Sequence, residues 1–139
     1  MMRSWIRDYF RDRRGATAIV FALSAIPMMG AMGAGIDFAR AKAASVELQS
    51  TLDGAVLAGA AVQTGQNTVA TNYFNSNLVL NGATLTNVAF TPNNDGTFSG
   101  TATITIPTTF LGVMGTHTIQ VTDNAKAAVA VAPARAHSA

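Results

Sequence analysis

The chain has 139 residues and no cysteine, and 12% of its residues are charged while 49% are hydrophobic. This length fits one small domain once a membrane segment is subtracted, and the lack of cysteine excludes disulfides and thiolate metal sites. The net charge of +2 is unevenly spread, because residues 1–14 hold five Arg against two Asp. Nucleic-acid binding needs Lys and Arg clustered on a folded surface, so no nucleic-acid partner is expected.

Residues 15–36 form an apolar stretch that contains no Asp, Glu, Lys, Arg or His. As an α-helix this stretch would be about 33 Å long, which is enough to cross the hydrocarbon core of a bilayer. By the positive-inside rule, the basic stub at residues 1–14 stays in the cytoplasm and the C-terminal part lies across the membrane. The sequence therefore predicts a single-pass protein that uses residues 15–36 as its transmembrane helix.

Small residues recur four positions apart within this stretch, a spacing that lets two helix backbones approach closely in lipid. The pairs are Ala18/Ala22, Gly30/Ala34 and Ala31/Gly35. We expect them to support helix packing, and a homo-oligomer through the transmembrane helix is one form that it could take. Pro27 lies between the pairs and predicts a kink, because proline lacks an N–H and crowds the carbonyl of Leu23.

A cleaved signal peptide is an open alternative for the same segment. The stretch follows a basic region, and Ala31-Met32-Gly33 offers small residues near a cleavage point, so that the mature protein would start near Ala34. The stretch is longer than the apolar region of an ordinary signal peptide, however, and the helical pattern continues past it. An uncleaved anchor is therefore the preferred interpretation.

The helical pattern continues over residues 37–64, which contain many strong helix formers and no proline. An apolar stripe runs from Phe38 to Gly59 at steps of three and four residues. Asp37 and Arg40 are three residues apart, which predicts a surface ion pair on this helix. If the anchor and this segment are one helix, it has roughly 47 residues and is about 70 Å long.

Residues 65–132 are expected to form a small α+β head, followed by a disordered tail at residues 133–139. A short helix is predicted at residues 67–80, and beyond it the apolar residues alternate with a period of two. The predicted strands cover residues 84–91, 97–106, 116–122 and 126–131, with a hairpin loop at residues 92–96 and an apolar turn at residues 107–115. The last two segments form a third strand that is broken near Asp123-Asn124. The fold class is α+β, with a long N-terminal helix and a small antiparallel β-meander.

No group of residues in the sequence indicates catalysis or metal binding. His117 lies between two threonines, and His137 lies in the tail. Neither histidine has a second ligand at a spacing typical of metal sites. The remaining carboxylates are scattered along the chain at Asp53, Asp95 and Asp123. A nucleophilic Ser or Thr would need a base held within reach, and none is indicated. The protein is therefore expected to be no enzyme and to bind no cofactor or metal.

The N-terminal half resembles the N-terminal module of the TadE/TadG-like proteins of Tad (Flp) pilus-assembly systems. The likeness lies in Arg13-Arg14-Gly15-Ala16, Ile19, Phe21-Ala22-Leu23, Pro27, Gly35-Ile36-Asp37, Arg40, Ala43, Leu48-Gln49 and Leu52-Asp53-Gly54-Ala55. It covers residues 1–62 well and residues 97–131 loosely, where the apolar turn is also similar. The resemblance implies a pilin-like protein of the bacterial inner membrane that faces the periplasm, serves an adhesive pilus, and has other pilus-assembly or pilin-like subunits as partners.

The resemblance also implies a processing site, because pilin-like members of the family are cut after a glycine with Glu five residues on. Gly15-Ala16 matches the cut, but Val20 stands where Glu is expected. In a pilin, this Glu can neutralise a freed N-terminal amine in an apolar core, where an unpaired charge is costly. An uncut, TadG-like anchored assembly factor is therefore preferred. A processed pseudopilin or minor pilin is the first alternative, and a soluble exported binding module is the second.

Overall fold

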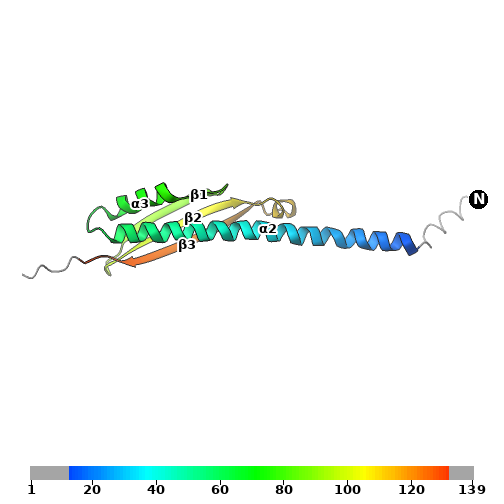
Figure 1. Cartoon of the computed structure of the whole chain (residues 1–139), viewed down its shortest axis with the longest axis horizontal. Coiled ribbons are helices and arrows are strands. Elements are labelled where there is room, and N and C mark those ends of the chain that lie inside the picture. The colour runs from blue at the N-terminus through cyan, green and yellow to red at the C-terminus, as the bar shows by residue number, and fades with distance from the viewer. Residues whose placement is uncertain (1–12, 132–139) are drawn as a thin grey trace, which may run out of the picture.

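The computed structural model describes residues 13–131 and begins with a single long helix, α2 (Arg13–Ala60). Its 48 residues confirm the prediction that the apolar stretch and its continuation form one helix. The helix runs through Pro27 without interruption, and Figure 1 shows a nearly straight rod, so the expected kink is not seen. Most of the predicted basic stub, and the whole predicted tail at residues 133–139, lie outside the described residues.

A second helix, α3 (Gln66–Asn77), turns back along the C-terminal end of α2. Gly65 precedes it with a left-handed backbone, at φ 71°, which reverses the chain between the two helices. The helix is shorter than predicted, because Leu78 is already extended. Asn81 and Gly82 then take positive φ angles of 40° and 89°. They form the turn that leads into the sheet.

Three antiparallel strands, β1 (Thr84–Pro92), β2 (Thr97–Pro107) and β3 (Thr118–Ala128), form a sheet in the order β1-β2-β3. The meander was predicted, but the predicted break in the third strand is wrong. Asp123 pairs in register with Ala102 of β2, and its carboxylate accepts a hydrogen bond of 3.4 Å from Ser45 of α2. Asn124 accepts one of 2.7 Å from Thr101. Tertiary partners thus hold two residues in a strand that their own preferences disfavour.

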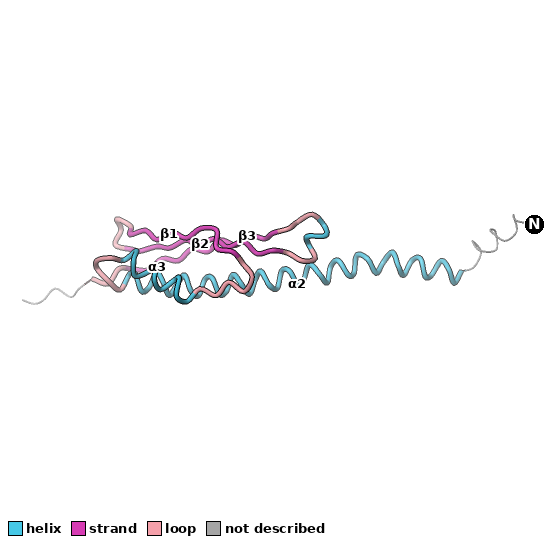
Figure 2. The backbone as a smooth tube through the Cα atoms, turned by 90° about the horizontal axis from the view of Figure 1, so that it is seen from above, coloured by secondary structure: helices cyan, strands magenta, loops and turns pink. Residues whose placement is uncertain are grey.

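The two helices lie side by side on one face of the sheet and leave the other face open (Figures 1 and 2). The C-terminal half of α2 covers β2 and β3, while α3 covers the β1 side. On the open face, hydroxyl groups pair across the strands at 2.9 Å, as Thr86 does with Thr105 and Thr103 with Thr122. The sheet thus has one apolar face and one polar face, as its period-two pattern predicted.

The hydrophobic core lies between the helices and the inner face of the sheet. Phe98 of β2 is fully buried at its centre and stacks on Phe90, with 6.2 Å between ring centroids. The other buried hydrophobic residues are Ala41, Leu48, Leu52, Ala55, Val56, Ala60, Ala70, Phe74, Ala102, Ile104, Ile106 and Ala125. The stripe on α2 therefore begins at Ala41, since Phe38 is 70% exposed.

Candidate functional site where the head meets the apolar helix

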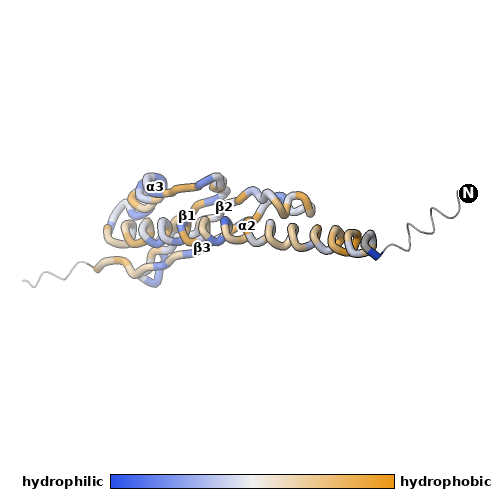
Figure 3. Tube along the Cα trace, turned by 45° about the vertical axis from the view of Figure 1, so that its right-hand side comes forward, coloured by the Kyte–Doolittle hydropathy of each residue, from blue (hydrophilic) through white to orange (hydrophobic). Residues whose placement is uncertain are grey.

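The N-terminal half of α2 extends beyond the head as an apolar rod (Figures 1 and 3). Its large side chains contact little of the chain itself: Phe21 is 74% exposed, Ile26 71% and Met29 71%. Leaving a continuous surface of this kind in water is costly, at about 25 cal/mol for each Å². Among the described residues, this is the one helix long and apolar enough to cross a membrane. A membrane anchor or a signal sequence would account for it.

Asp37 lies at the point where the apolar rod ends and the head begins, and only 2% of its surface is exposed. Its carboxylate accepts hydrogen bonds from the backbone N–H groups of Thr109 (3.0 Å), Phe110 (2.8 Å) and Leu111 (2.8 Å). These residues lead into a short 3₁₀ helix, η1 (Leu111–Met114), in the connection between β2 and β3. We call this set of three hydrogen bonds the Asp37 clamp. It ties the head to the helix beside the last turn of the apolar stretch.

The clamp replaces the surface ion pair that the sequence predicted between Asp37 and Arg40. That prediction is wrong, because Asp37 points into the head while Arg40 stays exposed. The guanidinium of Arg40 instead donates a hydrogen bond of 3.3 Å to the Thr109 hydroxyl. Both residues therefore bind the same connection between β2 and β3.

Hydrogen bonding favours the ionised carboxylate of Asp37. The N–H groups of Leu111 and Thr109 lower its pKa most, Phe110 and the charge of Arg40 add to the effect, and burial opposes it. Because the folded pKa lies below the ordinary value of 3.8, the clamp stabilises the fold fully above that pH. The stabilisation is lost as the pH falls through the lowered pKa.

We therefore expect that, as the pH falls, the amides of residues 109–111 lose protection before the amides of turns that contain no carboxylate. Hydrogen exchange, corrected for the intrinsic pH dependence of each amide, should show falling protection of Phe110 and Leu111 below about pH 4. The Ala83 N–H, which donates to the Leu80 carbonyl at 2.7 Å, is a control without a carboxylate. Equal loss of protection at Ala83 and Phe110 would mean that the fold opens as a whole.

Gly33, one turn before Asp37, provides the second contact between the rod and the connection. A Cβ atom at Gly33 would lie 2.4 to 2.5 Å from three carbon atoms of Phe110, so only glycine lets this aromatic side chain lie against the helix backbone. From the sequence, Gly33 was noted only beside a cleavage point, and the one contact predicted for Asp37 was the ion pair with Arg40. A signal for Asp37 was present, since it is the first charged residue after the 22 uncharged residues at 15–36.

The predicted packing pairs divide between two faces of α2. Gly30 and Ala34 are partly buried and share a face with Gly33 and Asp37, at spacings of three, four and seven residues. This pair therefore lies on the side where the head contacts the helix. The other four predicted residues, Ala18, Ala22, Ala31 and Gly35, are exposed. All six residues remain predicted contacts for a second helix.

The predicted processing residues Gly15, Ala16 and Val20 lie in the first two turns of α2 and are exposed. Val20 is 65% exposed, on a part of the helix that the head does not reach. A Cβ atom built on Gly15 would meet no other atom within 4 Å. The structure thus leaves this segment accessible, and cleavage after Gly15 remains the alternative to the preferred uncut chain.

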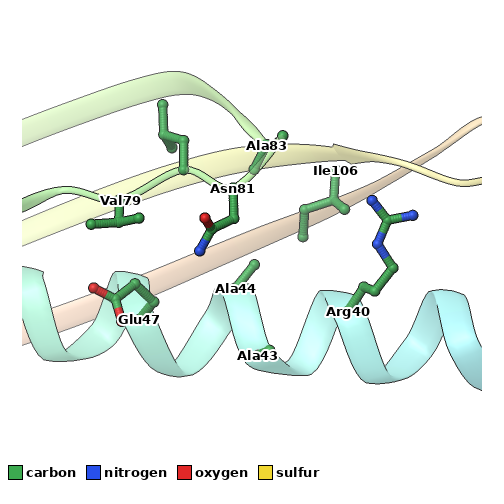
Figure 4. Close-up of a pocket in the computed structure, with 10 residues that line it drawn as sticks. Arg40, Ala43, Ala44, Glu47, Val79, Asn81, Ala83 and Ile106 are labelled. Atoms are coloured by element: carbon green, nitrogen blue, oxygen red, sulfur yellow. The ribbon is translucent and has the colours of Figure 1, made fainter.

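A groove of about 310 Å³ opens between α2 and residues 79–83 (Figure 4). Arg40 and Glu47 of α2 lie at its two ends, and the side chain of Asn81 points between them. Within residues 13–131, no three His, Asp or Glu side chains come close enough to hold a metal ion. The three scattered carboxylates lie apart: Asp53 is exposed, Asp95 pairs with Lys126 at 2.9 Å, and Asp123 accepts from Ser45.

A long apolar N-terminal helix whose second half packs on a three-stranded antiparallel sheet defines a pilin-like α+β protein. Residues 15–62 match the family described as putative Flp pilus-assembly TadE/G-like, and the match covers nearly all of α2. Residues 15–62, about a third of the chain, are thus similar to a TadE/G-like Flp pilus-assembly domain. Comparisons with curated proteins and with solved structures gave no match.

Proposed function

We propose that this protein is a non-enzymatic, TadG-like component of Tad (Flp) pilus assembly, anchored in the bacterial inner membrane by residues 15–36. Its N-terminus lies in the cytoplasm, and residues 37–64 and the head at residues 65–132 lie in the periplasm. The observation that carries the proposal is the exposed apolar half of α2 inside the TadE/G-like match. The helix packs with other assembly or pilin-like subunits in the membrane, and the head contacts them outside it.

Deleting the gene should abolish or strongly reduce surface pili and surface adhesion, because a pilus cannot form without a required assembly component. The measurement is electron microscopy of the cell surface together with an adhesion assay. Supplying the wild-type gene from a plasmid is the control, and it should restore both. Normal pili and adhesion in the deletion strain would contradict the proposed function.

The alternatives differ in where the mature chain begins. We expect the protein recovered from membranes to start at Met1 or Met2, because Val20 stands where a processed pilin needs a carboxylate. Intact mass and N-terminal sequencing measure this directly. A chain that starts at Ala16 would make the protein a pseudopilin or minor pilin. A soluble chain that starts near Ala34 would make it an exported binding module.

A further inference from the structure

The connection between β2 and β3 has an unusually apolar tip. Phe110 is 44% exposed, Val113 89% and Met114 74%. Residues 107–116 contain no charged side chain at all. Large apolar side chains that are exposed together indicate a surface that contacts a membrane or another protein. We call Phe110, Val113 and Met114 the apolar tip.

The Asp37 clamp and the contact with Gly33 fix the height of this tip along α2. Gly33 is three residues before the end of the uncharged stretch, or about 4.5 Å along the helix axis. The stretch of about 33 Å exceeds a hydrocarbon core of about 30 Å only slightly, so Gly33 lies near the boundary between acyl chains and headgroups. Phe110 packs on Gly33 and therefore lies at the same depth.

The orientation of the head agrees with this position. In Figures 1 and 2, the connection between β2 and β3 is the part of the head nearest to the N-terminal half of α2, which extends beyond the head. The β1–β2 loop at residues 93–96 lies at the opposite end of the sheet, beside the C-terminal end of α2. A bilayer crossed by residues 15–36 would therefore meet the apolar tip before any other part of the head.

We propose that the apolar tip is a second membrane contact, which inserts Phe110, Val113 and Met114 into the outer boundary of the bilayer that α2 crosses. The proposal rests on the proposed function, since it needs residues 15–36 to span the membrane. It attaches the head to the membrane at two points, through α2 and through the apolar tip, so that the tilt of the head relative to the membrane surface is restrained. The polar face of the sheet then keeps a fixed angle to the membrane surface.

The charges around the tip fit a lipid surface. Arg40 and Lys42 are the only Lys or Arg residues between positions 15 and 125, and both are exposed. They follow the end of the apolar stretch by four and six residues, which is about 6 to 9 Å along the helix. This is the level of lipid phosphates, to which guanidinium and ammonium groups reach. Asp37, whose charge would repel phosphate, is buried under its three N–H donors.

The test places a fluorescent probe at three depths in the full-length protein. Because the chain has no cysteine, a single one can be introduced by Val113→Cys, Asn94→Cys or Ile26→Cys and labelled with an environment-sensitive dye. Val113 reports on the tip, Asn94 on the exposed loop at the far end of the head, and Ile26 on the span. Each protein is reconstituted in phosphatidylethanolamine–phosphatidylglycerol vesicles. Quenching by aqueous iodide is compared with quenching by spin-labelled lipids of known depth.

We expect the Val113 probe to be quenched by shallow spin-labelled lipid and to be several-fold less sensitive to iodide than the Asn94 probe. The Ile26 probe should be quenched by deep spin-labelled lipid. A Val113 probe as open to iodide as Asn94, with Ile26 in lipid, would overturn the tip contact and leave the proposed function intact. A Val113 probe shielded from both quenchers would also overturn it, because a protein neighbour then covers the tip. Iodide access at Ile26 would overturn the membrane span and, with it, both proposals.

Discussion

Replacing Asp37 with asparagine should release the connection between β2 and β3 from α2 and leave the rest of the head folded. Asparagine has the same shape, but one of its two accepting oxygens becomes an NH₂ donor. The Oδ2 atom of Asp37 accepts from Phe110 and Leu111, and Oδ1 accepts from Thr109. In either orientation of the amide, at least one backbone N–H would then face another donor in a buried position.

Hydrogen exchange should detect this release as faster exchange of the amides at residues 109–111, on the order of tenfold. Asp53→Asn is a matched control, because Asp53 lies on the same helix and is exposed. It should leave these amides unchanged. Amides of the central strand β2 should keep their protection in both variants, which separates a local release from general unfolding. Full protection of residues 109–111 in Asp37→Asn would show that the clamp does not hold the connection.

The long helix and the hairpin could be predicted because their signals are local. Strong helix formers run from the apolar stretch to Ala60 without a terminating signal, and residues 92–96 combine Pro, Asn, Asp and Gly between two alternating segments. In the hairpin, Asp95 accepts hydrogen bonds from the N–H and hydroxyl groups of Thr97, and the Asn93 N–H donates to the Thr97 carbonyl at 2.8 Å. These contacts join neighbours in sequence, so composition was enough to find them.

The Asp37 clamp could not be predicted, because it joins residues that are 72 to 74 positions apart. Sequence spacing alone pairs Asp37 with Arg40, its neighbour on the helix surface, and nothing local says that the carboxylate turns inward. The same limit explains the predicted break at Asp123. A strand-disfavouring residue remained in β3 because Ser45 and Ala102, both distant in sequence, hold it there.

The small residues of α2 show that one spacing pattern can serve more than one kind of contact. Spacings of four singled out Gly30 and Ala34 as contacts for a second helix, and both lie on the face of α2 that also carries Gly33 and Asp37. Gly33 has no small neighbour four residues before it, and it is the glycine that the fold requires. Close approach of an aromatic side chain, here Phe110, leaves no periodic trace in the sequence. If α2 packs on another helix, the exposed Ala31 and Gly35 are the better candidates in this turn.

The strongest expected loss of stability comes from Phe98→Ala, at the centre of the head. Phe98 is fully buried, stacks on Phe90, and fills the space that Gly59 leaves open on α2, where a Cβ atom would lie 2.4 Å from its ring. Truncation to alanine removes the ring and leaves a cavity between helix and sheet. Changes of this kind cost about 3–5 kcal/mol in the free energy of unfolding. That is a large part of the stability of a small domain, about 5–15 kcal/mol.

Urea unfolding of the full-length protein in detergent micelles, followed through the circular dichroism of the sheet, should show this loss. Phe38→Ala is the matched control, because Phe38 is the same residue type but lies on α2 with 70% of its surface exposed. It should change the stability by less than about 0.5 kcal/mol. A loss for Phe98→Ala as small as that for Phe38→Ala would mean that the sheet does not depend on its contact with α2. A large loss for Phe98→Ala alone would instead show that the head depends on the contacts by which Phe98 joins Gly59 of the helix to Phe90 of the sheet.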